Sequence, residues 1–367
     1  MSLLKEAAEE IRRKIECKPL SEDAENWYKC LAAMDRNTYV PLQYKPGFLK
    51  YQEAYFKDVY EGFEDISMVL YRGGRPVGIW PVSIYLKDGK IRFCTAESAL
   101  LGPLFPFLPK AEGQRSVIGN CLGALLGIPE TDELLCAETV TEQGGSQWIR
   151  VLMEYGGRAQ PPKWEVFTDL NLSREEIQAR IRRTNKYSIA KGQEEYDIEL
   201  YDENSQNLDE AFEEFHKMHS EVAGRETRNQ ATWDAQLDII RESSAEKGRS
   251  FLVFIRDKAT RQLAGSALFD TTPQTATYCV AAYDRARFSK PVGHIVQAVA
   301  MEHMREKGIR WYEIGERNYP TDPGAYEKLV DIGHYKEGFA THFWPKVFVR
   351  IDREGFQGHI VKQEGPR

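Results

Sequence analysis

The stretch of residues 250–283, which reads SFLVFIRDKATRQLAGSALFDTTPQTATYCVAAY, decides the fold class of this chain. It holds three largely apolar runs, at 250–256, 264–270 and 275–283. Short polar segments between the runs predict tight turns, so we expect three consecutive strands. A helical pattern at 293–307 and a further strand at 310–315 follow. Successive strands followed by a helix and another strand predict a mixed α/β sheet.

The sequence around this stretch predicts more helices than strands. The capping box Ser173-x-x-Glu176 opens a helix that we expect to run to about Lys191, with Gly192 as its stop. Apolar residues at helical spacing predict further helices over 208–222 and 233–240 and around 326, and a last strand is expected over 346–351.

The first half of the chain repeats this alternation of helix and strand signals. We expect helices over 1–15 and 116–126, and strands over 66–71, 77–85 and 91–95. Gly73-Gly74 predicts a hairpin turn between two of the strands. Pro161-Pro162 interrupts the pattern, and we place a domain boundary near residue 160. The sequence thus predicts two α/β domains, 1–160 and 161–367, with the same coarse order of elements.

Composition and charge exclude several classes of protein. The chain has 367 residues, of which 42% are hydrophobic and 29% charged, and this is a globular composition. Its formal charge of −7, from 49 Lys and Arg against 56 Asp and Glu, excludes a chain-wide basic nucleic-acid binder but not a local basic patch. No run approaches the ~18 apolar residues of a membrane helix. The mixed charges of residues 1–16 and six widely spaced cysteines favour a cytoplasmic protein with reduced thiols.

A basic helix is the first candidate for binding chemistry. Between Glu176 and Glu194 the sequence carries no acid and five bases, which are Arg180, Arg182, Arg183, Lys186 and Lys191. Uncompensated bases on one helix of an acidic protein indicate a phosphate-bearing partner. A solvated face that pairs with acids elsewhere in the chain is the alternative.

A turn between two predicted helices is the second candidate. Arg225 and Arg228 flank this turn, and Trp233 follows soon after. Two guanidinium groups in such a place can grip a carboxylate or a phosphate bidentately. A surface loop held by ion pairs is the alternative.

A strand-to-helix connection is the third candidate. It begins at Asp284 and Arg285, and it continues through Lys290 and Gly293 to His294. Free N–H groups at the start of the following helix suit an anion. An ordinary connection between a strand and a helix is the alternative, and no nucleotide-binding glycine motif is present.

Two charged segments near the C-terminus complete the candidates. Glu313 and Glu316 stand at the end of a predicted strand, where a glutamate can act as a base. Lys336 stands in the glycine- and aromatic-rich segment 332–339, which we expect to be a loop from which the lysine reaches a carbonyl or phosphate oxygen. A pair of surface turns with solvated charges is the alternative, which these residues by themselves favour. No motif for a catalytic nucleophile is present, and His216-x-x-His219 lacks a third ligand, so we predict no metal site.

Four segments of the second half resemble the Fem-like transferases, which are the FemA/FemB/FemX group of the GNAT acyltransferase superfamily. These segments are Ile181–Ile189, His219–Trp233, Tyr283–His294 and Tyr335–Phe339. The last, Tyr-Lys-x-Gly-Phe, is similar to a Fem element whose lysine is functionally important. The resemblance implies an α/β fold of tandem GNAT-like domains with mixed sheets, and acyl transfer onto an amine.

The resemblance also implies roles for the candidate residues. Lys336 would stabilise the oxyanion or a donor phosphate, and Glu316 or Asp284 would accept the proton of the amine. The substrate or its phosphate would be bound by Arg182, Arg183, Lys186, Arg225, Arg228, Trp233, Arg285, Lys290 and His294.

The donor and the acceptor follow from the same resemblance. Fem enzymes use aminoacyl-tRNA and a peptidoglycan precursor, whereas other members of the superfamily use acyl-CoA. The GNAT pyrophosphate loop reads Q/R-x-x-G-x-G/A, and the bulky Ile295 of Lys290-x-x-Gly293-x-Ile295 favours a donor other than coenzyme A.

We therefore expect an N-acyltransferase with no tightly bound cofactor. It would move an aminoacyl group from aminoacyl-tRNA, or an acyl group, onto an amine of a phosphorylated acceptor such as a cell-wall precursor, a nucleotide-sugar or a small peptide. One alternative is an acyl-CoA-dependent N-acyltransferase of surface-glycan biosynthesis. The other is a non-catalytic double-GNAT module that binds RNA or a glycan precursor.

Overall fold

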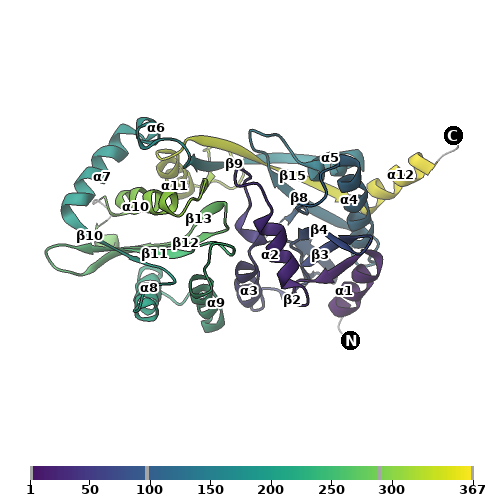
Figure 1. Cartoon of the computed structure of the whole chain (residues 1–367), viewed down its shortest axis with the longest axis horizontal. Helices are drawn as coiled ribbons and strands as arrows, with labels where there is room; N and C mark the ends of the chain where they lie inside the picture. The colour runs from purple at the N-terminus through teal and green to yellow at the C-terminus, as the bar shows by residue number, and fades with distance from the viewer. Residues whose placement is uncertain (1–2, 96–98, 288–290, 365–367) are drawn as a thin grey trace. The chain divides into compact units, whose positions relative to one another are not determined.

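The computed structural model describes residues 3–95, 99–287 and 291–364, and the chain forms two compact units (Figure 1). The first unit consists of Met1–Asp35, Phe48–Pro162 and Pro345–Arg367, and the second of Arg36–Gly47 and Lys163–Trp344. The chain passes between the units near the predicted boundary at 160. A linear division into 1–160 and 161–367 nevertheless differs from this arrangement, because the segment 36–47 packs within the second unit and the C-terminal residues within the first.

The sheet of the second unit contains six strands that lie side by side in the order β10-β11-β12-β13-β14-β9. Their bounds are β9 Arg158–Asp169, β10 Tyr196–Tyr201, β11 Phe251–Asp257, β12 Leu263–Thr271, β13 Thr275–Tyr283 and β14 Trp311–Arg317. Neighbouring strands are antiparallel except β13 and β14, which are parallel. They are parallel because the helix α10 (Val292–Glu306) connects them as a crossover.

Helices cover both faces of this sheet, and alternate residues of β11 face the two cores. Phe251 and Val253 pack in the core that contains α10, α6 (Arg174–Arg180) and α7 (Arg183–Glu195). Leu252 and Phe254 pack in the core that contains α8 (Leu208–Ala223) and α9 (Gln230–Arg241). The remaining elements of this unit are η1 (Leu42–Tyr44) and α11 (Glu327–Glu337). The strand period of two thus explains why nearly every residue of β11 is apolar.

The first unit contains two three-stranded antiparallel sheets, β1-β3-β4 and β2-β5-β6. In addition β7 pairs in parallel with β8, and β8 pairs with the final part of β15. The bounds are α1 Leu3–Lys14, β1 Cys17–Pro19, α2 Ala24–Ala32, α3 Pro46–Phe56, β2 Glu61–Asp65, β3 Met68–Arg72, β4 Arg75–Trp80, β5 Ser83–Lys87, β6 Lys90–Cys94, β7 Leu100–Leu101, α4 Ala111–Leu126, β8 Glu133–Thr139, α5 Gln147–Glu154, β15 His342–Asp352 and α12 Arg353–Glu364. Leu4 and Ile11 of α1 pack with Leu122 of α4 in its main core.

The predicted elements of the second half are largely confirmed, including the three strands at 250–283 and the helix that follows. The capping box of Ser173 and Glu176 is formed at the start of α6. The predicted single helix to Lys191 is wrong, because Ile181 adopts an extended ψ of 131° and divides it into α6 and α7. Gly192 is not a stop either, since α7 continues to Glu195.

Two further expectations are corrected by the structure. The segment 332–339 is not a loop, because the helix α11 runs through it as far as Glu337. The predicted strand 77–85 is in fact two strands, because β4 ends before Pro81 and β5 begins after Val82. The hairpin turn at Gly73-Gly74 is confirmed between β3 and β4.

Candidate active site

The parallel strands β13 and β14 diverge soon after they pair. Their ladder joins Thr275–Thr277 to Trp311–Glu313. Just beyond it, β13 has an extra residue, Cys279, opposite β12, and β14 has an extra residue, Ile314, opposite β9. An extra residue bends a strand and increases its local twist. The pairing of β13 with β14 ends at this level, and we call this place the β13–β14 divergence.

Lys336 lies at the divergence, on the last turn of α11. Its ammonium nitrogen lies so close to Gly315 of β14 that a β-carbon on this glycine would collide with it. Burial lowers the pKa of Lys336, and the charges of Glu313 and Glu316 act in the opposite direction. A half-buried ammonium group that is fixed beside a strand is suited to stabilise an oxyanion.

Glu313, on β14, presents a carboxylate at the same place. Its Oε2 atom accepts a hydrogen bond from the hydroxyl of Tyr39 at 2.8 Å and another from Thr277 Oγ1 at 3.4 Å. Its charge also acts on Lys336 and Cys279. A carboxylate held in this way, within electrostatic reach of an ammonium group, can accept a proton from an amine. From the sequence we favoured Glu316 over Glu313 as the base, since nothing in the sequence signals that Glu313 contacts a residue 274 positions away.

The N-terminal turn of α10 is tied to α11 next to Lys336. The hydroxyl of Tyr335 donates a hydrogen bond to the carbonyl oxygen of Gly293 at 2.6 Å. The ring of His294 packs edge-on against Tyr335 with 5.1 Å between centroids, and burial lowers the pKa of His294. His294 is therefore neutral near pH 7, and it lies beside the helix terminus that the sequence predicted to bind an anion.

Ile295 does not point toward this terminus. Its side chain is fully buried in the core between α7 and α10, where a β-carbon on Gly192 would lie 3.0 Å from it. Gly192 is therefore a close-packing residue that lets the two helices approach. The bulk of Ile295, from which we predicted a donor other than coenzyme A, lies in the protein interior.

The other two predicted catalytic residues have different surroundings. Both carboxylate oxygens of Glu316 lie 3.1 Å from Nζ of Lys163, in a partly exposed ion pair. Asp284 stands after the end of β13, where its Oδ1 accepts a hydrogen bond from the Ala286 N–H at 3.0 Å. Asp284 and Arg285 line a hollow of about 680 Å³ together with residues of α8. Glu316 thus belongs to the β13–β14 divergence, whereas Asp284 stabilises a turn at the far end of β13.

The predicted phosphate-binding bases Arg182, Arg183 and Lys186 all follow the break between α6 and α7. Arg182, at the start of α7, contacts the ring Nε2 of His334 at 2.8 Å, and it donates to the His334 carbonyl oxygen at 3.1 Å. It also lies 3.9 Å from the carboxylate of Glu337. These contacts tie α7 to the end of α11 on either side of Lys336. Arg183 and Lys186 instead project from α7 as exposed side chains.

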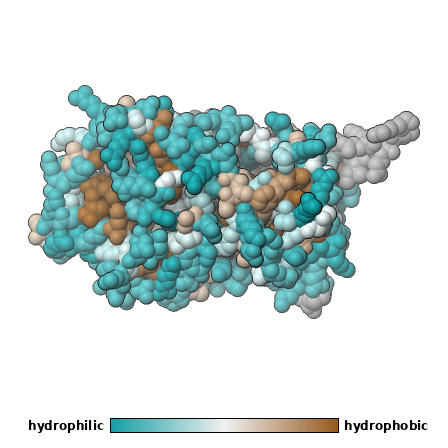
Figure 2. All heavy atoms as spheres, in the orientation of Figure 1, coloured by the Kyte–Doolittle hydropathy of each residue, from teal (hydrophilic) through white to brown (hydrophobic). Residues whose placement is uncertain are grey.

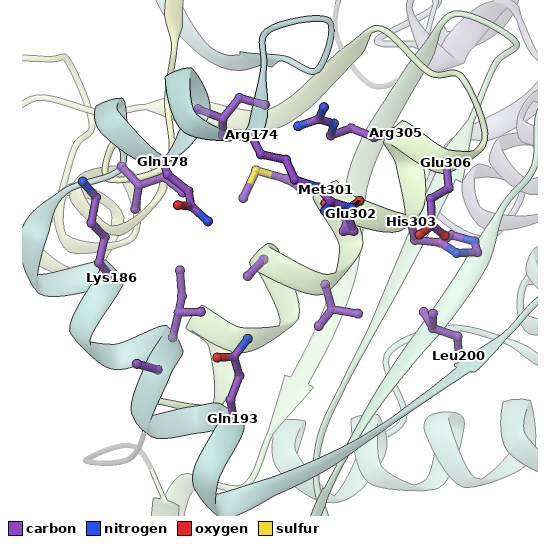
Figure 3. Close-up of a pocket in the computed structure, with 16 residues that line it drawn as sticks. Arg174, Gln178, Lys186, Gln193, Leu200, Met301, Glu302, His303, Arg305 and Glu306 are labelled. Carbon is purple, nitrogen blue, oxygen red and sulfur yellow. Dashed lines mark hydrogen bonds and ion pairs between the residues drawn. The ribbon is translucent and has the colours of Figure 1, made fainter.

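A groove of about 710 Å³ lies between α6, α7 and the second half of α10 (Figure 3). Its walls carry the apolar residues Ile177, Ile181, Ile189, Leu200, Val299 and Met301. Lys186 and Gln193 reach it from α7, and Arg305 reaches it from α10. Figure 2 shows a mainly hydrophilic face with apolar residues gathered where Figure 1 labels α7 and α10. Lys186 is thus the predicted site residue that borders this groove.

The turn after α8 is held together by Glu226. This carboxylate accepts hydrogen bonds from Trp233 Nε1 at 2.8 Å and from Ser220 Oγ at 3.0 Å, and it contacts His216 at 2.9 Å. These hydrogen bonds lower the pKa of Glu226 to about 2. The guanidinium of Arg228 stacks on the buried ring of Trp233 at 4.8 Å. Trp233 and Arg228 therefore shape the turn, and Arg225 is exposed on it.

Three expectations from the sequence remain, and they concern Lys290, a metal site and a membrane-spanning helix. Lys290 lies outside the residues that the structure describes. Within the described residues, no cluster of three or more His, Cys, Asp or Glu side chains is arranged to hold a metal ion. In the same part of the chain, no helix combines the length and apolar character needed to cross a membrane.

The comparisons with known proteins agree with this architecture. Residues 178–337 match a family model described as an acetyltransferase (GNAT) domain. The structure of FemX is similar, with a TM-score of 0.60 and 13% identity over 89% of this chain and 99% of FemX. No curated protein sequence matches the chain significantly.

Two further solved structures are also similar to this chain. One is the C-terminal domain of a protein described as a lysylphosphatidylglycerol synthetase from Agrobacterium fabrum, with a TM-score of 0.57 and 12% identity over 93% of this chain and 95% of that domain. The other is L-PGS from Bacillus licheniformis, with a TM-score of 0.51 and 12% identity over 81% of this chain and 87% of that one. At these identities the likeness is one of fold.

The second unit therefore resembles a GNAT domain over residues 178–337. The chain as a whole has the FemAB-like GNAT fold, as its resemblance to the Fem group implied. The predicted fold class, α/β with tandem GNAT-like domains and mixed sheets, is confirmed.

Proposed function

We propose that this protein is an N-acyltransferase that moves an aminoacyl or acyl group onto an amine of a phosphorylated acceptor. The observation that carries the proposal is the joint presence of Lys336 and Glu313 at the β13–β14 divergence. The GNAT-domain match and the fold shared with FemX support N-acyl or aminoacyl transfer in general.

Each of the two residues has one task in this reaction. The nitrogen of the acceptor amine attacks the carbonyl carbon of the donor ester or thioester, and Glu313 accepts a proton from that nitrogen. The ammonium group of Lys336 stabilises the negative charge that develops on the carbonyl oxygen. The carbon–oxygen or carbon–sulfur bond then breaks, the leaving group takes up a proton, and an amide remains.

Aminoacyl-tRNA is the donor that we place first, and acyl-CoA is the alternative. The exposed bases Arg183 and Lys186 of α7 are available to bind phosphate groups of a large donor or of the acceptor. Acyl-CoA is retained as the alternative donor because the side chain of Ile295 is buried and does not obstruct the N-terminus of α10. Both donors are cytoplasmic, and we propose the cytoplasm as the location of the protein.

A donor screen tests the proposal. Labelled aminoacyl-tRNAs and acyl-CoAs are each incubated with the protein and with amine-bearing nucleotide-sugars, cell-wall precursors and small peptides, and amide formation is measured. We expect one donor class to label one acceptor class, and the label to vanish in Lys336→Met. Loss of transfer after ribonuclease treatment identifies tRNA as the donor. Transfer that Lys336→Met leaves unchanged contradicts the proposal, and so does binding of a donor without transfer to any acceptor.

A further inference from the structure

The segment Arg36–Gly47 lies across a row of polar side chains in the second unit. Asp270, Thr277 and Glu313 are direct cross-strand partners on β12, β13 and β14. Partners in register share one face of a sheet, so the three side chains form a continuous row. Tyr39 of the segment reaches the Glu313 end of this row. At the other end, Lys45 Nζ donates a hydrogen bond to Ser250 Oγ at 2.8 Å, and its charge acts on Asp270.

Backbone hydrogen bonds fix the position of this segment. The N–H of Val40 donates to Thr275 Oγ1 at 3.1 Å, and its carbonyl oxygen accepts from Thr272 Oγ1 at 3.3 Å. Both threonines are buried at the turn between β12 and β13. Both the N–H and the carbonyl group of Val40 are therefore hydrogen-bonded, so the backbone of the neighbouring Tyr39 has little freedom.

The ring of Tyr39 is fixed as well as its backbone. It packs edge-on against Phe167 with 5.0 Å between ring centroids, and it lies tilted against Trp344 with 6.1 Å between centroids. Phe167 and Trp344 are themselves buried together with Trp311. A phenol ring held in this way directs its hydroxyl group to one place, and the acceptor found there is Oε2 of Glu313.

We propose that Tyr39 is a positioning residue of the acyl-transfer site, which holds the carboxylate of Glu313 ionised and aimed at the β13–β14 divergence. The inference rests on the proposed function, in which Glu313 accepts the proton of the amine. It adds that the segment 36–47, distant in sequence from the GNAT-domain match at 178–337, supplies a side chain that the reaction needs.

The groups around Glu313 decide the direction of the expected effect. The hydroxyls of Tyr39 and Thr277 donate to the carboxylate, and Lys336 acts on it as a positive charge. Among the described residues, Cys279 on β13 and Glu316 on β14 also interact electrostatically with this cluster. A hydrogen bond to the ionised form favours that form. Removal of the Tyr39 hydroxyl therefore moves the titration of the Glu313 carboxyl to higher pH.

Carboxyl titration by NMR tests this inference without any substrate. Protein labelled with ¹³C at the glutamate carboxyl is titrated, and Glu313→Gln identifies the resonance. We expect Tyr39→Phe to move the titration midpoint upward by about one pH unit, a tenfold change in the proton affinity of the carboxylate. Tyr39→Phe keeps the ring contacts, and thermal unfolding checks that the fold is retained. Tyr55→Phe, on α3, is the matched control and is expected to leave the midpoint unchanged.

The outcomes separate this inference from the proposed function. A midpoint that Tyr39→Phe leaves in place overturns the inference, whatever the enzyme catalyses. With a donor and acceptor from the screen, we expect the acidic limb of kcat/KM against pH to move in the same direction as the midpoint. A uniform loss of kcat/KM at all pH values also overturns it, because that is the effect of a purely structural tyrosine. Failure of the screen combined with a shifted midpoint contradicts the proposed reaction and leaves the hydrogen bond established.

Discussion

The ammonium nitrogen of Lys336 occupies the space that the side chain of any other residue would need at Gly315. Gly315 has a φ of 120°, in a region that residues with a β-carbon rarely adopt, and a β-carbon there would collide with the lysine. The glycine of β14 therefore serves two purposes. It permits the backbone bend at the divergence, and it leaves room for the lysine that we assign to the oxyanion.

The first prediction separates these two purposes with Gly315→Ala. We expect a loss of about 10²-fold in kcat, because the methyl group displaces Nζ of Lys336 from the oxyanion position. The control is Gly308→Ala, since Gly308 also has a positive φ, of 76°, and the described residues leave open space around it. The control is expected to cost about 1 kcal/mol of stability through strain alone and to keep full turnover. Equal turnover of the two variants speaks against the placement of Lys336.

The second prediction concerns the pH dependence that Lys336 imposes. Burial lowers its pKa below the ordinary 10.5, and its role requires the protonated form. Turnover is therefore expected to fall as pH rises through this lowered pKa. Lys336→Arg keeps a charge that does not titrate in this range, so the alkaline limb of kcat should move to higher pH, with a lower plateau because the guanidinium has another shape. Lys336→Met is expected to lose about 10²- to 10³-fold in kcat. If the fall of kcat at high pH stays at the same pH in Lys336→Arg, the group that titrates there is not Lys336.

The third prediction concerns the buried pair of Lys45 and Asp270. Burial lowers the pKa of Lys45 to about 8 and raises the pKa of Asp270, while each charge favours ionisation of the other. Lys45→Met removes the hydrogen bond to Ser250 and the positive charge that favours ionisation of Asp270, and it is expected to cost about 1–3 kcal/mol of stability. The double variant Lys45→Met with Asp270→Asn should cost markedly less than the sum of the single variants. Additive losses in urea unfolding contradict the pairing.

The same pair has a consequence for stability against pH. Between pH 8 and 10.5 the folded protein binds fewer protons at Lys45 than the unfolded chain does. The contribution of this group to the free energy of unfolding therefore rises with pH across this window. Lys45→Met should remove that rise, which unfolding curves at several pH values can detect. Lys328→Met, on α11, is a control in which the pH dependence should persist.

The fourth prediction distinguishes the bases at the start of α7. Arg182→Gln loses the contacts with His334 and Glu337, so we expect it to lower both stability and turnover. Arg183→Gln and Lys186→Gln are expected to change stability by less than about 0.5 kcal/mol, since both side chains are exposed. If they bind phosphate, they should raise KM for the phosphate-bearing substrate and weaken its dependence on salt. An unchanged KM in both variants assigns these bases to a solvated surface.

The fifth prediction concerns Ile295 and the donor. Because this side chain is fully buried, Ile295→Ala is expected to cost about 2–5 kcal/mol of stability through the cavity that it leaves. It should bring no gain in affinity for coenzyme A, which can be measured by calorimetry. A clear gain in affinity would mean that the isoleucine does obstruct a donor at the N-terminus of α10.

Much of the fold was predictable because the relevant signals are local. The three strands at 250–283 and the helix α10 follow from residue periodicity within a few turns of chain. The end of α8 at Gly224, with a φ of 71°, is a conformation for which glycine is the usual residue. Such features depend on neighbours in sequence, and the sequence contains those neighbours.

The errors at Gly192 and in the segment 332–339 have one common cause. Glycine was interpreted there as a helix breaker, but both helices need it for close packing. A β-carbon on Gly192 would lie 3.0 Å from Ile295, and one on Gly333 would lie 2.9 Å from the backbone nitrogen of Asn318. A sequence does not distinguish a glycine that ends a helix from one that lets another element approach, because the approaching element comes from elsewhere in the chain.

The sequence by itself determined the GNAT-type α/β fold and pointed to Lys336, because periodicity and a short motif are encoded in adjacent residues. The tertiary structure alone decided which groups stand beside that lysine. It brought Glu313 to the divergence and Tyr39 to Glu313, and it buried Ile295 away from the helix terminus. The physical reason is that these relationships depend on strand register, on bulges at Cys279 and Ile314, and on a segment that crosses the sheet from a distant part of the chain.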